Sequence, residues 1–172
     1  DGYKLIETAH LGMEHQSGIA YGNKFINGYL GRDNSGSGWG LKWDFIVAHE
    51  SGHEWFGNNI TSKDLADMWI HESFIDYHYG KAAGQAYIWG NRQGILNDAP
   101  LQGPYGVNKE GSGDMYVKGG VLHNMIRTII DDDETWRSIL RGLNNDFYHQ
   151  TVDYQDILTY LNKKSGIDFT KV

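Results

Sequence analysis

The hydrophobic pattern changes once along this chain of 172 residues. Short β-type stretches broken by glycine, YKLIET and SGIAYG, occupy the region from Tyr3 to about Ile26 and predict a small sheet. Beyond that region the apolar residues recur with the period of an amphipathic helix. The predicted helices are 44–56, 67–79, 85–97, 116–130, 133–143 and 153–164. The pattern therefore indicates an α+β fold, in which a small sheet with an edge strand precedes a mostly helical part.

Two connecting segments have compositions that suggest their roles. The stretch NGYLGRDNSGSGWG, at 27–40, is rich in Gly, Ser and Asn, which is typical of a surface loop. A place on the rim of a cleft is the alternative. The stretch DDDETW, at 131–136, is interpreted as a helix start and not as an acidic binding site, because carboxylates are favoured near the positive end of a helix dipole.

Composition narrows the class of protein. The chain is 40% hydrophobic without any apolar run of membrane-spanning length, so we expect a globular domain with no membrane segment. Its 15 basic residues face 22 acidic ones, and the net charge of -7 argues against a nucleic-acid partner. With no cysteine, any metal must be held by His, Asp or Glu. The length fits one domain, 1–172, and the start at Asp1 suggests a piece excised from a longer multidomain chain.

The stretch VAHESGHEWFGN places three titratable side chains within an apolar helix. His49 and His53 lie one helical turn apart on one face, with Glu50 beside them, and a metal ion would pair these groups. A catalytic zinc site uses three protein ligands, and Glu72, in MWIHESFIDY, is the candidate third ligand. Glu50 is then the general base that takes a proton from the zinc-activated water. The alternative, a helix with these groups facing solvent, is disfavoured by the apolar residues around them.

Four segments resemble one family, the zinc aminopeptidases of the membrane alanyl aminopeptidase type, which are gluzincins that include leukotriene-A hydrolase. HESGHEWFGN is similar to HExxHxWFGN, and WIHESF is similar to W-x-x-E-x-F. LGMEHQ resembles the GxMEN exopeptidase motif, and DMYVKGG resembles the Y-x-K-G segment. All four occur in the family's order, between Leu11 and Gly120. The resemblance implies a thermolysin-like zinc peptidase catalytic domain with one zinc ion per chain.

The resemblance also implies roles for single residues at the centre of the site. His49, His53 and Glu72 match the zinc ligands, and Glu50 matches the general base. Tyr116 matches the tyrosine whose hydroxyl binds the developing oxyanion, a contact made only in the transition state.

On the substrate side, Glu14 matches the glutamate that binds the α-ammonium group of the substrate. Gly12 and Met13 belong to the same substrate-binding motif, with Met13 near the floor of the first side-chain pocket. Asp76, one turn after Glu72, is a candidate to accept a hydrogen bond from a zinc-ligand imidazole, and a solvated carboxylate is the alternative.

The GxMEN segment departs from the family pattern at two positions. Leu11 stands where the family has its first glycine, and His15 stands where it has asparagine. Leucine can still offer its backbone to an extended substrate, but its bulk would change the first pocket. Histidine would add pH dependence.

The function that these residues favour is a zinc metallopeptidase that removes the first residue from peptides with a free amino terminus. A thermolysin-like endopeptidase is the alternative within the hydrolases, and a zinc-binding module without catalysis is the alternative outside them. Similar bacterial members suggest a periplasmic or extracellular location. Full-length members carry flanking domains that help to close the cleft. Without them the site is wetter, so we expect this segment to bind zinc but to turn over peptides slowly or not at all.

Overall fold

The computed structural model describes residues 2–34, 36–77, 88–90 and 92–172, without the side chains of 76 and 77. The amino-terminal part is a three-stranded sheet in the order β1-β3-β2. Its strands are β1 (Lys4–Glu7), β2 (Gly12–Met13) and β3 (Gly18–Tyr21). β1 pairs with β3 in parallel and β2 pairs with β3 antiparallel, so β2 is an edge strand.

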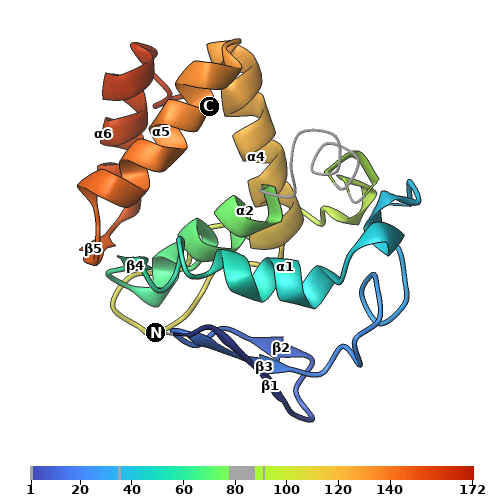
Figure 1. Ribbon diagram of the computed structural model, residues 1–172. Coiled ribbons are helices and arrows are strands. Elements are labelled where there is room, and N and C mark those ends of the chain that lie inside the picture. The colour runs from blue at the N-terminus through green and yellow to red at the C-terminus, as the bar shows by residue number, and fades with distance from the viewer. Residues whose placement is uncertain (1, 35, 78–87, 91) are drawn as a thin grey trace.

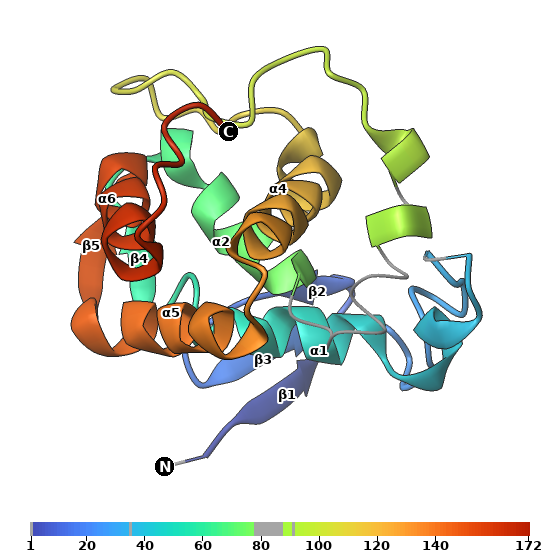
Figure 2. The same cartoon turned by 90° about the horizontal axis from the view of Figure 1, so that it is seen from above.

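The rest of the described chain is mainly helical. The α-helices are α1 (Phe45–Gly52), α2 (Trp69–Tyr77), α4 (Asp114–Ile130), α5 (Asp133–Asp146) and α6 (Tyr154–Ser165). Short 3-10 helices are η1 (Trp39–Lys42), η2 (Leu65–Asp67) and η3 (Arg92–Gly94). α1 lies between the sheet and the other helices (Figure 1). Seen from above, α2 and α4 run next to each other, and α5 and α6 lie to one side of them (Figure 2). The α+β prediction is confirmed.

The hydrophobic core holds α2 in place. Phe74 of α2 is fully buried and stacks on Phe56, with ring centroids 4.3 Å apart. Trp136 and Ile139 of α5 and Ile126 of α4 belong to the same cluster. Because close-packed interiors yield little, this core gives the neighbouring helical turns fixed positions.

Helix starts follow the capping signals in the sequence. Asp44 caps α1 by accepting a hydrogen bond from the backbone N–H of Val47. Asp132 caps α5, which confirms that DDDETW is a helix start. Asp153 caps α6 and forms a capping box with Asp156.

Some strands and helix ends differ from the sequence prediction. The pattern gave no sign of β4 (Ile60–Ser62) and β5 (Gln150–Val152), which form a separate parallel pair. Three residues are too few to show an alternating pattern. The helix predicted to 56 ends at Gly52, with His53 as its C-cap, and Phe56 instead forms a bridge with Ile60.

The helix predicted at 85–97 lies partly outside the described residues. Residues 88–90 are helical and η3 follows, but the chain from 95 to 97 is not helical, so the predicted end at 97 is wrong. The reason is a competing partner, because the N–H groups of Leu96 and Asn97 donate to the carboxylate of Asp114. Asn97 has a left-handed backbone, with φ of 53°.

Candidate metal centre and substrate pocket

α1 presents His49 and Glu50 in its last turn and His53 at its C-cap. His53 is 1% exposed, and its Nδ1 lies 3.0 Å from the carbonyl oxygen of Phe56. A carbonyl can only accept a hydrogen bond, so Nδ1 donates to it, and Nε2 is the nitrogen of this ring that a metal ion could bind. This is the arrangement in which an imidazole binds a metal through Nε2.

α2 brings Glu72 to the two histidines. Glu72 Oε2 lies 3.2 Å from His49 Nε2 and 3.7 Å from His53 Nε2, and the two nitrogens are 3.3 Å apart. In a tetrahedral zinc site with bonds of about 2.0–2.1 Å, neighbouring ligand atoms lie about 3.3 Å apart. The three atoms therefore have the spacing of three corners of such a site.

Burial supports the same interpretation of this cluster. His49, His53 and Glu72 are at most 9% exposed, and a group of polar atoms so buried is costly unless it has a partner. Burial raises the pKa of Glu72, but its contacts with His49 and His53 outweigh this effect, and the net shift is downward. An ionised carboxylate together with two imidazole nitrogens is a good donor set for a divalent cation.

Glu50 lies beside the cluster with one oxygen unsatisfied. It is 6% exposed, and its Oε2 has no hydrogen-bond partner among the residues described. Burial raises the pKa of the Glu50 carboxyl to about 7, and the charges of Glu14 and Glu72 act in the same direction, against that of His49. An orphaned buried carboxyl oxygen next to three ligand atoms is placed to bind water or substrate at the metal.

The edge strand β2 lies directly against Glu50. A methyl group on Gly12 would overlap Glu50 Oε1 and lie 2.7 Å from Ile46 Cγ2, so only a glycine allows this approach. Glu14 follows β2, and its carboxylate lies within 4.8 Å of ligand atoms of Glu50 and His53. The approach of β2 thus brings a further carboxylate to the cluster of His49, His53 and Glu72.

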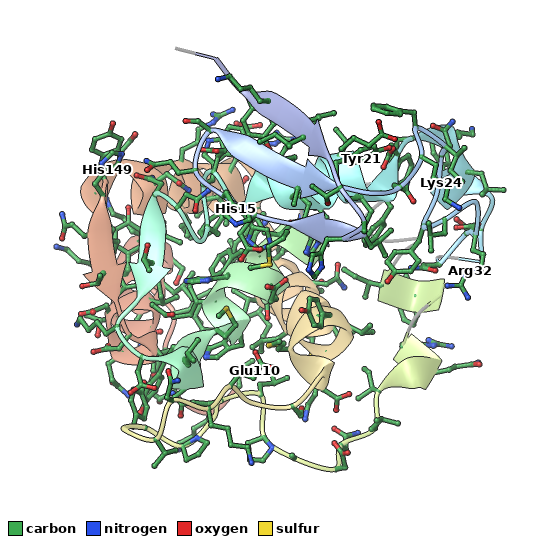
Figure 3. All side chains as sticks on the ribbon, turned by 90° about the horizontal axis from the view of Figure 1, so that it is seen from below. His15, Tyr21, Lys24, Arg32, Glu110 and His149 are labelled. Atoms are coloured by element: carbon green, nitrogen blue, oxygen red, sulfur yellow. The ribbon has the colours of Figure 1, made fainter. Side chains whose placement is uncertain are left out.

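Met13 and His15 of the GxMEN-like segment do not line the pocket beside Glu50. The Met13 side chain is 48% exposed and is not among the residues that line the pocket beside Glu50. His15 lies on the turn after β2 (Figure 3), with its Nδ1 3.3 Å from the carbonyl oxygen of Met13. The side chain of Asp76, the predicted partner of a zinc-ligand imidazole, lies outside the described residues.

A pocket of about 440 Å³ opens beside the cluster. Its lining residues come from the β2 segment, α1, α4 and the glycine-rich segment: Leu11, Gly12, Tyr29, Asn34, Phe45, Ile46, His49, Glu50 and Tyr116. The Tyr116 ring lies 6.2 Å from the His49 ring, measured between centroids. A larger hollow of about 610 Å³ lies between α1 and α5, but His49, His53 and Glu72 are not among the residues that line it.

Tyr29 and Asn34 are pocket residues that the sequence did not single out. They belong to the segment 27–40, so the rim alternative describes it better than a plain surface loop. Tyr29 packs edge-on against Phe45, which stacks on His49, with centroid distances of 5.7 Å in both pairs. A glycine-rich segment has no periodic pattern of apolar residues, so nothing in the sequence indicated these contacts.

A buried asparagine anchors this rim. Asn23 is fully buried, and its Nδ2 lies 2.8 Å from the carbonyl oxygen of Ile26 and 3.0 Å from that of Gly28. The same amide donates to Asp44, the cap of α1, at 2.7 Å. Tyr21, at the end of β3 and beside the segment with Lys24 and Arg32 (Figure 3), also donates to Asp44. The rim is therefore fixed to the start of the helix that carries the histidines.

A helix with two histidines and a glutamate, completed by a glutamate from the next helix, is the arrangement of HExxH metal-dependent peptidases. The comparison with protein families agrees with this class. The Peptidase family M1 domain matches residues 8–102, more than half of the chain. The chain belongs to peptidase family M1, which confirms the resemblance found in the sequence.

Curated relatives and solved structures extend this match. "Probable aminopeptidase 2" of Sulfurisphaera tokodaii is 27% identical over 140 residues, covering 70% of this chain and 18% of that protein. Aminopeptidase N of Lactococcus lactis is 25% identical over 177 residues, which cover 91% of this chain and 20% of that protein. The M1 zinc metallopeptidase of Deinococcus radiodurans, with bound Tyr-Ser-Ala, superposes with a TM-score of 0.69 at 20% identity, covering 95% and 36%. Yeast LTA4 hydrolase superposes with a TM-score of 0.65 at 18% identity, and the match covers 98% of this chain and 29% of that protein.

This chain corresponds to one part of each of these longer relatives. The chain spans 18% to 23% of the length of the first two curated relatives. Within the described part of the chain, every helix is too short or too polar to cross a bilayer.

Proposed function

We propose that this chain is the catalytic part of a zinc aminopeptidase, an enzyme that removes the first residue from peptides with a free amino terminus. The observation that carries the proposal is the convergence of His49 Nε2, His53 Nε2 and a Glu72 oxygen at metal-ligand spacing. The carboxyls of Glu50 and Glu14 adjoin these atoms on one side.

In this proposal His49, His53 and Glu72 hold one zinc ion. Zinc bound there would act as a Lewis acid toward the substrate carbonyl and the attacking water. Glu50 accepts a proton from that water and returns it to the leaving amine. Tyr116, on the pocket wall near His49, donates a hydrogen bond to the oxyanion as it develops.

The amino-terminal specificity rests on Glu14. A carboxylate fixed beside the metal pairs with the α-ammonium group of a substrate, and it disfavours the middle of a peptide chain, which has no such charge. β2 is an edge strand, so an extended peptide can lie along it and bring its first carbonyl to the metal.

Two other functions stay open as alternatives. A thermolysin-like endopeptidase would use the same metal site without the Glu14 contact, and a zinc-binding module would hold the metal without turnover. Glu50 and Tyr116 favour an enzyme, because a module that only binds metal needs neither a base nor an oxyanion donor. We also propose that residues 1–172 form one catalytic domain, against which other domains of a longer protein pack, because the relatives are several times longer.

The test is hydrolysis of leucine p-nitroanilide and N-acetyl-leucine p-nitroanilide by the zinc-loaded chain at high enzyme concentration. We expect slow cleavage of the free-amine substrate alone. Cleavage of the blocked substrate at the same rate would assign an endopeptidase instead. Bound zinc with no cleavage of either substrate would support the binding module or an inactive truncated domain.

A further inference from the structure

The helices that carry Glu72 and Tyr116, α2 and α4, touch backbone to backbone next to the pocket. Ser73, which follows Glu72, is fully buried, and its hydroxyl donates a 2.7 Å hydrogen bond to the carbonyl oxygen of Met115. Met115 directly precedes Tyr116. One buried hydrogen bond thus joins the chain neighbours of a metal ligand and of the pocket tyrosine.

Gly119 lies opposite Ser73, one turn further along α4. A methyl group there would overlap Ser73 Oγ and would lie 2.5 Å from Ser73 Cβ and 3.2 Å from Ser73 Cα. The last of these atoms belongs to the backbone, so a new side-chain rotamer of Ser73 could not remove the overlap. Only glycine at 119 allows α2 and α4 to come this close.

The start of α4 is held from the other side as well. Asp114 is 4% exposed, and its carboxylate accepts hydrogen bonds from the N–H groups of Leu96, at 3.0 Å, and Asn97, at 2.8 Å. Tyr116 therefore lies between two fixed points of α4, the carboxylate of Asp114 and the close contact of Gly119 with Ser73. Any displacement of α4 away from α2 changes where the Tyr116 side chain lies relative to Glu72.

We propose that Ser73 and Gly119 are positioning residues, which set the distance between the Tyr116 hydroxyl and the metal site. This inference rests on the proposed function, in which Tyr116 binds the oxyanion. A donor of this kind acts over about 2.7–3.1 Å, and a misplacement of about 1 Å can cost about 100-fold. The helix contact thus has a role in the reaction beyond stabilising the fold.

The test measures binding and does not depend on turnover. A phosphinic pseudodipeptide, whose tetrahedral phosphorus replaces the scissile carbonyl, is titrated into the zinc-loaded chain by calorimetry, with leucine as the ligand that has a planar carboxylate and no tetrahedral centre. Gly119→Ala is expected to weaken pseudodipeptide binding about 10- to 100-fold, with zinc content and leucine binding unchanged. Ser73→Ala removes the hydrogen bond to Met115 but keeps the close packing of α2 against Gly119, so we expect pseudodipeptide affinity to fall only a few-fold.

Two further variants separate positioning from a general loss of structure. Ser73→Gly removes two of the three atoms that the new methyl would strike, so Ser73→Gly with Gly119→Ala should recover most of the lost affinity. In a Tyr116→Phe background, Gly119→Ala should cause no further loss, because the group that it displaces is gone.

Three outcomes would count against the inference. If Gly119→Ala binds the pseudodipeptide as tightly as the unmodified chain, or weakens it equally in the Tyr116→Phe background, the positioning role is refuted while the proposed function stands. If the unmodified chain binds no zinc, the proposed function fails first and this inference fails with it.

Discussion

The metal side and the substrate side of the site are built very differently. His49, His53 and Glu72 are almost completely buried, on two helices that the core holds in place. Glu14 follows a two-residue edge strand, β2, whose Met13 side chain is half exposed. We infer that metal binding depends on the core of this chain, whereas substrate binding depends on one short strand and its close approach to α1.

Glu50 lies where the two sides meet, and its substitution should have the largest effect on turnover. Glu50→Gln keeps the size of the side chain and the contact with Gly12, but it cannot accept a proton. We expect turnover of leucine p-nitroanilide to fall about 10²- to 10⁴-fold with zinc content unchanged. A variant that keeps the original rate would refute the assignment of Glu50 as the base.

Glu14 tests the substrate side alone, with an intermediate effect. Glu14→Gln removes the charge that pairs with the α-ammonium group and leaves the metal ligands untouched. Affinity for a phosphinic pseudodipeptide with a free amine should fall about 10- to 100-fold, as for a lost hydrogen bond to a charged group.

The matched measurements for Glu14 use its neighbour and a blocked ligand. His15→Gln changes an exposed side chain of the same turn and should leave this affinity nearly unchanged. The N-acetylated pseudodipeptide should bind Glu14→Gln and the unmodified chain equally. An equal loss for both ligands would show that Glu14 supports the structure of the site and does not bind the amine.

Substitution of Leu11 should have the smallest effect, limited to the preference for the side chain of the first substrate residue. It lines the pocket with Glu50, so Leu11→Ala enlarges the space near the first residue of the substrate. The ratio of hydrolysis rates for phenylalanine and alanine p-nitroanilides should rise about three- to tenfold, the effect of a few buried methylene groups. An unchanged ratio would mean that Leu11 contributes only its backbone.

The sequence predicted the metal side better than the substrate side, for a physical reason. His49 lies in the last turn of α1 and His53 is its C-cap, one turn later, so their juxtaposition follows from local geometry alone. The approach of β2 to Glu50 is a contact between distant segments, and it depends on the absence of a side chain at Gly12. Such contacts leave no periodic signal.

The same distinction holds for the fold. Helices with capping residues were predicted well at their starts: α5 begins at the predicted residue after Asp132, and α6 begins one residue later than predicted, after Asp153. β4 and β5 were missed because each has only three residues and pairs with a strand far away in the sequence. The pocket residues Tyr29 and Asn34 were missed because the rim that carries them is held by Asn23 and not by a regular element.

The most direct test of the central claim is zinc content, measured by mass spectrometry on the purified chain and on His53→Ala. His10→Ala, which replaces an exposed histidine outside the cluster, is the control. We predict one zinc ion per chain in the unmodified protein and in the control, and almost none in His53→Ala, because two ligands cannot hold the ion against solvent. Equal zinc in all three proteins, or none in the unmodified chain, would contradict the metal site from which every other part of this account is derived.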